Sequence, residues 1–218
     1  MAEAEDVITD AARHATEFAR DLWRRHRPPQ ERRHLRVGDV APRLDFLLTA
    51  LFDRGWTLRS AAVPPPRTML HRVFRRSIPY QSQAIPATDG HTLWLPDALD
   101  SPDPLRALRR MRAQALMQAM RATRGTVHAV QQCADPLTRA LLQVLEAHAA
   151  DADLVRLLPG LADDLHAVRA RALGARPPPP AFGDDSRALE RLVRQVMGIG
   201  PGAGEGPFAP APTAMDSL

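Results

Sequence analysis

The chain has 218 residues, 29 basic side chains against 25 acidic ones, and a single cysteine. Its apolar share of 44% and charged share of 25% are those of a soluble globular protein, and its length allows a sizeable core. One cysteine excludes a disulfide framework and a four-cysteine zinc site. Every basic side chain is an arginine, and the absence of lysine excludes P-loop nucleotide hydrolysis and Schiff-base catalysis.

The sequence predicts neither a secretory signal nor a membrane span. The first ten residues, Met1–Asp10, are acidic rather than basic and then apolar, which is the order in a signal peptide. No apolar run approaches the roughly 18 residues of a transmembrane helix. We therefore expect a cytoplasmic protein that does not insert into membranes.

Two helices are predicted in the first quarter of the chain. Apolar residues spaced by three and four positions favour an amphipathic helix over Glu3–Arg25. A buried helix is expected over Ala41–Phe52, with Asp39 as its N-cap and Pro42 in its first turn, where a missing N–H is harmless.

A small β element is predicted next. Trp56–Val63 has the pattern of a short strand, and a short helix is expected over Thr68–Arg75. The segment Ala84–Pro96 predicts a hairpin, because Asp89–Gly90 is a dipeptide typical of a type I′ turn. The sheet is not expected to exceed three strands.

The second half of the chain predicts helices separated by proline and glycine. They are expected over Pro104–Thr123, from Asp135–Pro136 to Ala149, over Asp151–Leu158, over Leu161–Gly174 and over Ser186–Met197. The chain is thus predicted to be mostly α, with a helical domain over residues 1–176 that contains the hairpin. A proline-rich linker (177–185), an amphipathic helix (186–198) and a disordered tail (199–218) follow.

Basic charge is concentrated in residues 31–80, which hold ten arginines against four acidic residues. Such a stretch suggests a nucleic-acid-binding module as an alternative function. Few aromatic residues are interleaved with these arginines, so stacking platforms for bases are scarce. The pattern favours a solvated face over a surface that binds nucleic acid.

No enzymatic constellation is found. The eight histidines include no i, i+4 pair and no H-E-x-x-H motif, and nothing local supports Cys133 as a nucleophile with His128 as its base. The acid pairs are interpreted as helix caps: Asp151/Asp153, Asp163/Asp164 and Asp184/Asp185. The sequence therefore predicts a non-catalytic protein with no metal and no cofactor.

Three stretches resemble the N-terminal region of NorD/CbbO-type proteins. They are APRLDFLLTALF (41–52), AIPATDGHTLWLP (84–96) and LVRLLPGLADDLHAVRARALGARPPP (154–179), with a helix of the type MRAQALMQAMRA (111–122) between the last two. The resemblance covers roughly residues 35–180. Members of that family end in a von Willebrand factor A domain, whose D-x-S-x-S signature is absent here, so the chain is expected to be a short paralogue, a truncated form or one piece of a split gene.

The resemblance implies an adaptor function. NorD/CbbO-type proteins act with a MoxR-class AAA+ ATPase (NorQ/CbbQ type) to activate a client metalloenzyme, either nitric oxide reductase or Rubisco. Two interaction surfaces are expected on this chain: the hairpin with Thr88, Asp89, Gly90, His91 and Trp94, and the arginine cluster Arg72, Arg75 and Arg76.

Overall fold

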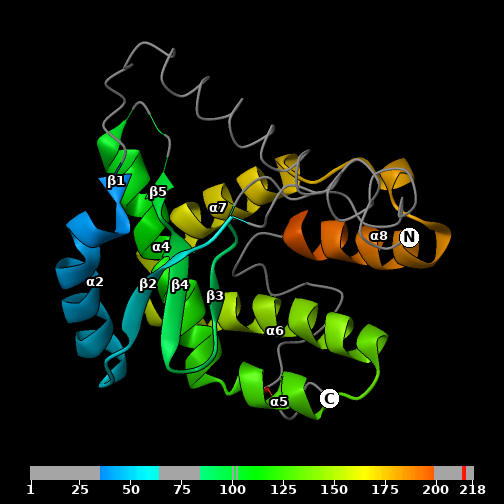
Figure 1. Ribbon diagram of the computed structural model, residues 1–218, viewed down its shortest axis with the longest axis horizontal. Coiled ribbons are helices and arrows are strands. Elements are labelled where there is room, and N and C mark those ends of the chain that lie inside the picture. The colour runs from blue at the N-terminus through cyan, green and yellow to red at the C-terminus, as the bar shows by residue number, and fades with distance from the viewer. Residues whose placement is uncertain (1–34, 64–83, 100, 102, 199–212, 215–218) are drawn as a thin grey trace, which may run out of the picture. The chain divides into compact units, whose positions relative to one another are not determined.

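The structure is a computed structural model that describes residues 35–63, 84–99, 101, 103–198 and 213–214 (Figure 1). The described residues form a mostly helical protein with a small sheet, as the sequence predicts. The helices predicted over Glu3–Arg25 and Thr68–Arg75 lie outside the described residues.

Helix α2 (Val37–Phe52) begins earlier than predicted. Asp39 is not its N-cap; its carboxylate Oδ2 accepts a hydrogen bond from the Arg36 backbone N at 3.1 Å, as the third residue of a capping box does. Pro42 consequently lies inside the helix rather than in its first turn. The helix is not buried all round, because Phe46 is 77% exposed.

The strands form two small sheets. Strand β4 (Thr92–Pro96) lies between β2 (Thr57–Ala61), which it pairs in parallel, and β3 (Ala87–Thr88), which it pairs antiparallel. The three strands confirm the predicted size of the sheet. A separate antiparallel ladder, which the sequence analysis did not predict, joins β1 (Leu35–Arg36) and β5 (Ala98–Leu99).

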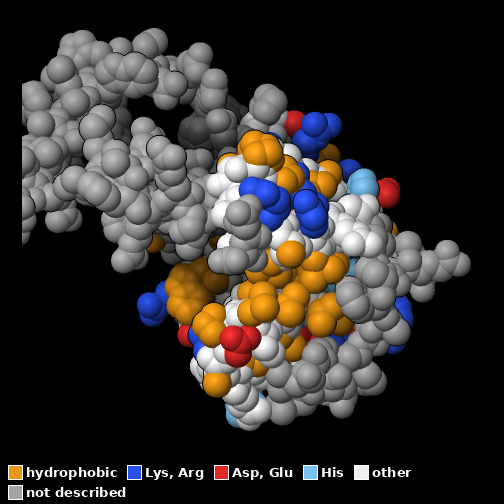
Figure 2. Space-filling view, turned by 90° about the vertical axis from the view of Figure 1, so that its right-hand side faces the viewer, with side chains coloured by type: hydrophobic (Ala, Val, Ile, Leu, Met, Phe, Trp, Pro, Cys, Tyr) orange, Lys and Arg blue, Asp and Glu red, His pale blue; other side chains and the backbone are white. Residues whose placement is uncertain are grey.

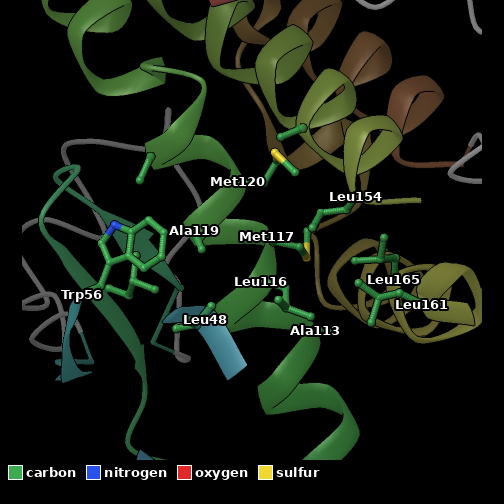
Figure 3. Close-up of a cluster of buried hydrophobic side chains, with 13 residues drawn as sticks. Leu48, Trp56, Ala113, Leu116, Met117, Ala119, Met120, Leu154, Leu161 and Leu165 are labelled. Carbon is green, nitrogen blue, oxygen red and sulfur yellow. The ribbon is translucent and has the colours of Figure 1, made fainter. Parts of the chain in front are cut away.

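Helix α4 (Pro104–Thr123) has the predicted bounds and lies at the centre of the fold. The carboxylate of Asp103 caps it by accepting a hydrogen bond from Leu105 N at 2.9 Å. Residues Ala115–Ala119 are all buried, so this middle part of the helix is enclosed around its whole circumference. It contributes to two apolar clusters. One is shared with α2, β4 and β5; the other, drawn in Figure 3, runs from Leu48 of α2 and Leu93 of β4 past α4 to α6 and α7.

The remaining helices pack on α4 and on one another. They are α5 (Thr126–Gln132), α6 (Pro136–Leu157), α7 (Ala162–Gly174) and α8 (Asp184–Gly198), with short 3-10 turns η1 (Pro159–Leu161) and η2 (Pro179–Ala181). Helix α5 was not predicted. The two helical pieces predicted over Asp135–Ala149 and Asp151–Leu158 are one continuous helix, α6.

The ends of the described chain meet the predictions in part. Helix α8 confirms the predicted terminal helix and extends it by two residues at its start, and it packs on α6 and α7. Within the stretch predicted to be a disordered tail, the structure describes Thr213 and Ala214, and Ala214 is 1% exposed.

Candidate functional site

The loop of the β3–β4 hairpin, residues Thr88–Thr92 (the hairpin loop), is held by its own polar side chains. Asp89 Oδ1 accepts hydrogen bonds from the backbone N of His91 at 2.9 Å and of Thr92 at 2.6 Å. Thr88 Oγ1 accepts from Gly90 N at 3.0 Å and donates to Thr92 O at 2.9 Å. These hydrogen bonds stabilise the conformation of the loop from within.

The predicted type I′ turn is wrong. Such a turn needs positive φ at both central residues, and here only Gly90 has it, at +92°, while Asp89 does not. The reason is local: the Asp89 carboxylate accepts hydrogen bonds from the amides two and three residues further on, and this bridging replaces the two-residue backbone turn.

Arg54 joins the loop to the end of α2, and sequence analysis missed it. Its guanidinium Nη2 donates to Gly90 O at 2.9 Å and lies 3.3 Å from His91 Nδ1. The same guanidinium lies 5.5 Å from the ring centroid of Trp56, which packs edge-on against Phe52. No local signal in the sequence connects positions 54 and 90, because the contact depends on the parallel pairing of β2 with β4.

The loop presents a small polar surface. Asp89, His91 and Arg54 are all exposed, and together they offer an anion, an imidazole and a guanidinium. Hydrogen bonds from the amides of Thr92 and His91 hold the pKa of Asp89 below its usual range, so the carboxylate stays charged. The Asp89 carboxylate and the Arg54 guanidinium place a negative and a positive charge side by side. Because hydrogen bonds already fix the loop, binding a protein partner here would cost little conformational entropy.

The other predicted site residues are not part of this surface. Trp94 lies in β4, half-buried, and alternates with the buried Leu93 and Leu95, so it belongs to the opposite face of the strand. The predicted arginine cluster Arg72, Arg75 and Arg76 lies outside the described residues.

A buried ionic network links α4, α5 and α6, and it too was missed. Arg124 Nε and Nη2 donate to the two carboxylate oxygens of Glu146, both at 3.0 Å, with side chains 4% and 0% exposed. Arg124 Nη1 also donates to Asp153 at 2.5 Å, and Thr126 Oγ1 donates to Glu146 at 3.1 Å. Burial lowers the pKa of Arg124, but the hydrogen bonds to Glu146 and Asp153 outweigh it, so the net shift is upward.

A second buried pair joins α6 to α7. Asp151 Oδ2 accepts a hydrogen bond from Arg169 Nε at 2.7 Å. Burial raises the pKa of Asp151 against the opposing charges of Arg169 and Arg121, and burial lowers the pKa of the nearby His148. Asp151 and Asp153 are therefore not the predicted helix caps; they lie inside α6 and pair with arginines of other helices or of the same one.

The other acid pairs differ from one another. Asp163 and Asp164 lie in the first turn of α7, where acidic residues were expected, but the N-cap is Leu161 and no side chain makes a cap hydrogen bond. Asp164 instead accepts a hydrogen bond from Arg112 at 2.6 Å. Helix α8 begins at Asp184. One feature of the sequence could have indicated these buried pairs. Glu146 and Arg169 lie four residues after Leu142 and Leu165, at positions where an amphipathic helix has its apolar side chains.

Hydrophobic side chains gather on the face of the molecule shown in Figure 2, which lies on the right in Figure 1 with α6 and α8. Both helices keep half-buried apolar residues: Leu141, Val144 and Leu145 on α6, and Leu189, Leu192 and Val193 on α8. Incompletely covered apolar surface of this kind is typical of proteins that contact other proteins.

Within the described part of the chain, no group of three or more histidine, cysteine, aspartate and glutamate side chains is placed to hold a metal ion. Among the helices that the structure describes, none has both the length and the apolar character that crossing a membrane requires.

Comparison of the chain with protein-family models, with curated proteins and with solved structures finds no match. The resemblance to NorD/CbbO-type proteins accordingly stays a prediction.

Proposed function

We propose that this chain is a non-catalytic adaptor that binds a partner protein through the hairpin loop. The observation that carries the proposal is the loop itself: its backbone is held by Asp89 and Thr88, while His91 and Arg54 remain exposed at its tip. A rigid loop loses little conformational entropy when it is bound, which favours affinity and specificity.

The partner proposed is the one that the family resemblance implies. In that proposal a MoxR-class AAA+ ATPase of the NorQ/CbbQ type binds the chain, and the complex activates a client metalloenzyme, nitric oxide reductase or Rubisco. The incompletely covered apolar face in Figure 2 supports a protein-binding function of this general kind.

Binding of the full chain to the cognate MoxR-class ATPase, with and without the client, tests the proposal. The double variant His91→Ala/Arg54→Ala removes both exposed tip groups and leaves Asp89 and Thr88 in place. We expect its Kd for the ATPase to rise roughly tenfold or more, as the loss of interface anchors does.

The matched control is His166→Ala/Arg109→Ala, which removes the same residue types from exposed positions on α7 and α4. Its Kd should equal that of the wild type, and thermal unfolding of both variants shows whether they remain folded. Equal affinities of the loop variant and the control would refute the loop as the binding surface, and no binding by the wild type would refute the ATPase as partner.

The alternative, a nucleic-acid-binding module using residues 31–80, has no specific observation in its favour. The described part of this stretch holds four exposed arginines, Arg36, Arg43, Arg54 and Arg59, beside three exposed aspartates, Asp39, Asp45 and Asp53. The near balance of charge gives phosphates no strong local attraction.

A further inference from the structure

A second contact site, unrelated to the hairpin loop, lies where α5 meets α6. Its apolar lining consists of Ala129, Val130, Cys133 and Leu142, and we call it the α5–α6 site. The residue that completes this cluster comes from the far end of the chain: Ala214 is 1% exposed and packs among these side chains. In Figure 1 the short segment Thr213–Ala214 lies beside α5.

The α5–α6 site is shaped by the turn between its two helices. Arg139 Nη2 donates to Cys133 O at 2.7 Å, and Cys133 N donates to Val130 O at 3.3 Å. The side chains that surround Ala214 are small or apolar, namely Ala129, Cys133 and Leu142. In such a closely packed apolar cluster, replacing alanine by a larger or charged residue is unfavourable.

We infer that the α5–α6 site is a binding site for a chain segment that carries a small apolar residue, and that Thr213–Ala214 is its ligand within the same molecule. One alanine buries little apolar surface, so the contact is weak enough to exchange with a segment of the same chemistry. In this proposal Thr213–Ala214 covers the site and competes with any other segment for it. This inference does not depend on the proposed function, because the site shares no residue with the hairpin loop.

The only cysteine of the chain reports on this contact directly, because Cys133 is buried in the same cluster as Ala214. The rate at which the full chain's thiol reacts with iodoacetamide therefore measures how often the segment leaves. In the variant Ala214→Asp, the buried carboxylate is disfavoured, and we expect alkylation at least about ten times faster than in the wild type.

The control is Ala203→Asp, which makes the same change of charge elsewhere in the C-terminal region and should leave the rate unchanged. Unfolding monitored by circular dichroism shows that the fold of Ala214→Asp is retained. A folded Ala214→Asp variant that reacts as slowly as the wild type would overturn the inference, because Cys133 would then be shielded by its own helices alone.

A peptide supplied in trans tests the site separately from the segment. The synthetic peptide of residues 209–218 should slow alkylation of the Ala214→Asp variant toward the wild-type rate, whereas the same peptide with aspartate at position 214 should not. Equal effects of the two peptides would overturn the assignment of a binding site.

Protein concentration distinguishes the chain's own segment from that of a second copy. Protection within one molecule does not change on dilution, so we expect the same wild-type rate over a hundredfold range of concentration. A rate that rises on dilution would overturn the intramolecular contact and show exchange between copies.

Discussion

Arg124 and Glu146 are charged residues with buried side chains, and their geometry accounts for their burial. Two parallel hydrogen bonds of 3.0 Å satisfy both carboxylate oxygens, and the hydroxyl of Thr126 adds a third. Bidentate arginine–carboxylate pairs are among the stronger hydrogen-bonded contacts in proteins. Burying the two charges nevertheless costs desolvation free energy, so the complete pair adds little net stability. Removing only one partner is much more destabilising, because it leaves the other charge buried without its partner.

Removing one partner of this pair should therefore lower the free energy of unfolding more than removing both partners. We expect Arg124→Leu to lower the free energy of unfolding by about 3–5 kcal/mol, because Glu146 keeps its charge in a buried place. The double variant Arg124→Leu/Glu146→Leu should lose less than this single variant. Urea denaturation measures all three proteins.

The less buried pair Arg112–Asp164 provides the control, since its side chains are 42% and 17% exposed. Arg112→Leu should cost no more than about 1 kcal/mol. A loss as large as that of Arg124→Leu, or a double variant less stable than the single one, would contradict this account of the buried pair.

His148 should make stability depend on pH. Burial lowers its pKa below the ordinary 6.5, and the charge of Arg169 adds to this effect while Asp151 opposes it. The unfolded chain therefore takes up the proton at a higher pH than the folded one does. The contribution of His148 to the free energy of unfolding is complete above 6.5 and is lost as the pH falls through the folded pKa.

The variant His148→Gln lacks this titration, so its unfolding free energy should fall less on acidification from about pH 8 to about pH 5. Denaturant unfolding of both proteins over this range gives the difference directly. His166→Gln, at an exposed position, is the control and should follow the wild type. Parallel curves for wild type and His148→Gln would show that His148 is not the group responsible.

At the scale of elements, α4 organises the fold because it is buried on almost every side. In Figure 3 its residues point toward Leu48 and Trp56 on one side and toward Leu154 and Leu165 on the other. Helix α4 thus packs against α2 and the sheet on one side and against α6 and α7 on the other. Its sequence is rich in alanine and methionine, which allow close approach and adaptable packing.

A cavity in the cluster beside α4 should be costly. Leu154 of α6 is fully buried there, and Leu154→Ala is expected to lower the free energy of unfolding by about 2–5 kcal/mol. Leu105, in the first turn of α4, is 58% exposed, and Leu105→Ala should change the free energy of unfolding by about 0.5 kcal/mol or less. Thermal unfolding compares the stability of the two variants. Similar losses of stability would contradict the assignment of Leu154 to the core beside α4.

At the scale of the whole described unit, an ion pair and a hydrogen bond attach helix α8 to the segment that follows α7. Glu190 of α8 is buried and pairs with Arg176, just after α7, and with Arg194 at 2.8 Å. Arg194 also donates to Pro177 O at 2.5 Å, at the start of the proline run. The predicted amphipathic terminal helix therefore packs on α6 and α7.

The sequence by itself determined the elements whose signals are local. The Asp103–Pro104 and Asp135–Pro136 dipeptides mark helix starts because the cap and the first-turn proline act within a few residues. Alternation in Thr92–Pro96 predicts a strand for the same reason, since side chains two residues apart share one face. The terminal helix and the small size of the sheet also followed from such short-range patterns.

Only the tertiary structure decided which neighbours these elements acquire. The contact of Arg54 with Gly90, the burial of Glu146 against Arg124 and the seat of Ala214 on α5 and α6 all join residues far apart in sequence. The exposure of Phe46 is another case, because its helix turns that position away from the core although its residue type favours burial. Local spacing carries no information on these pairings, since each depends on how separate helices and strands pack together.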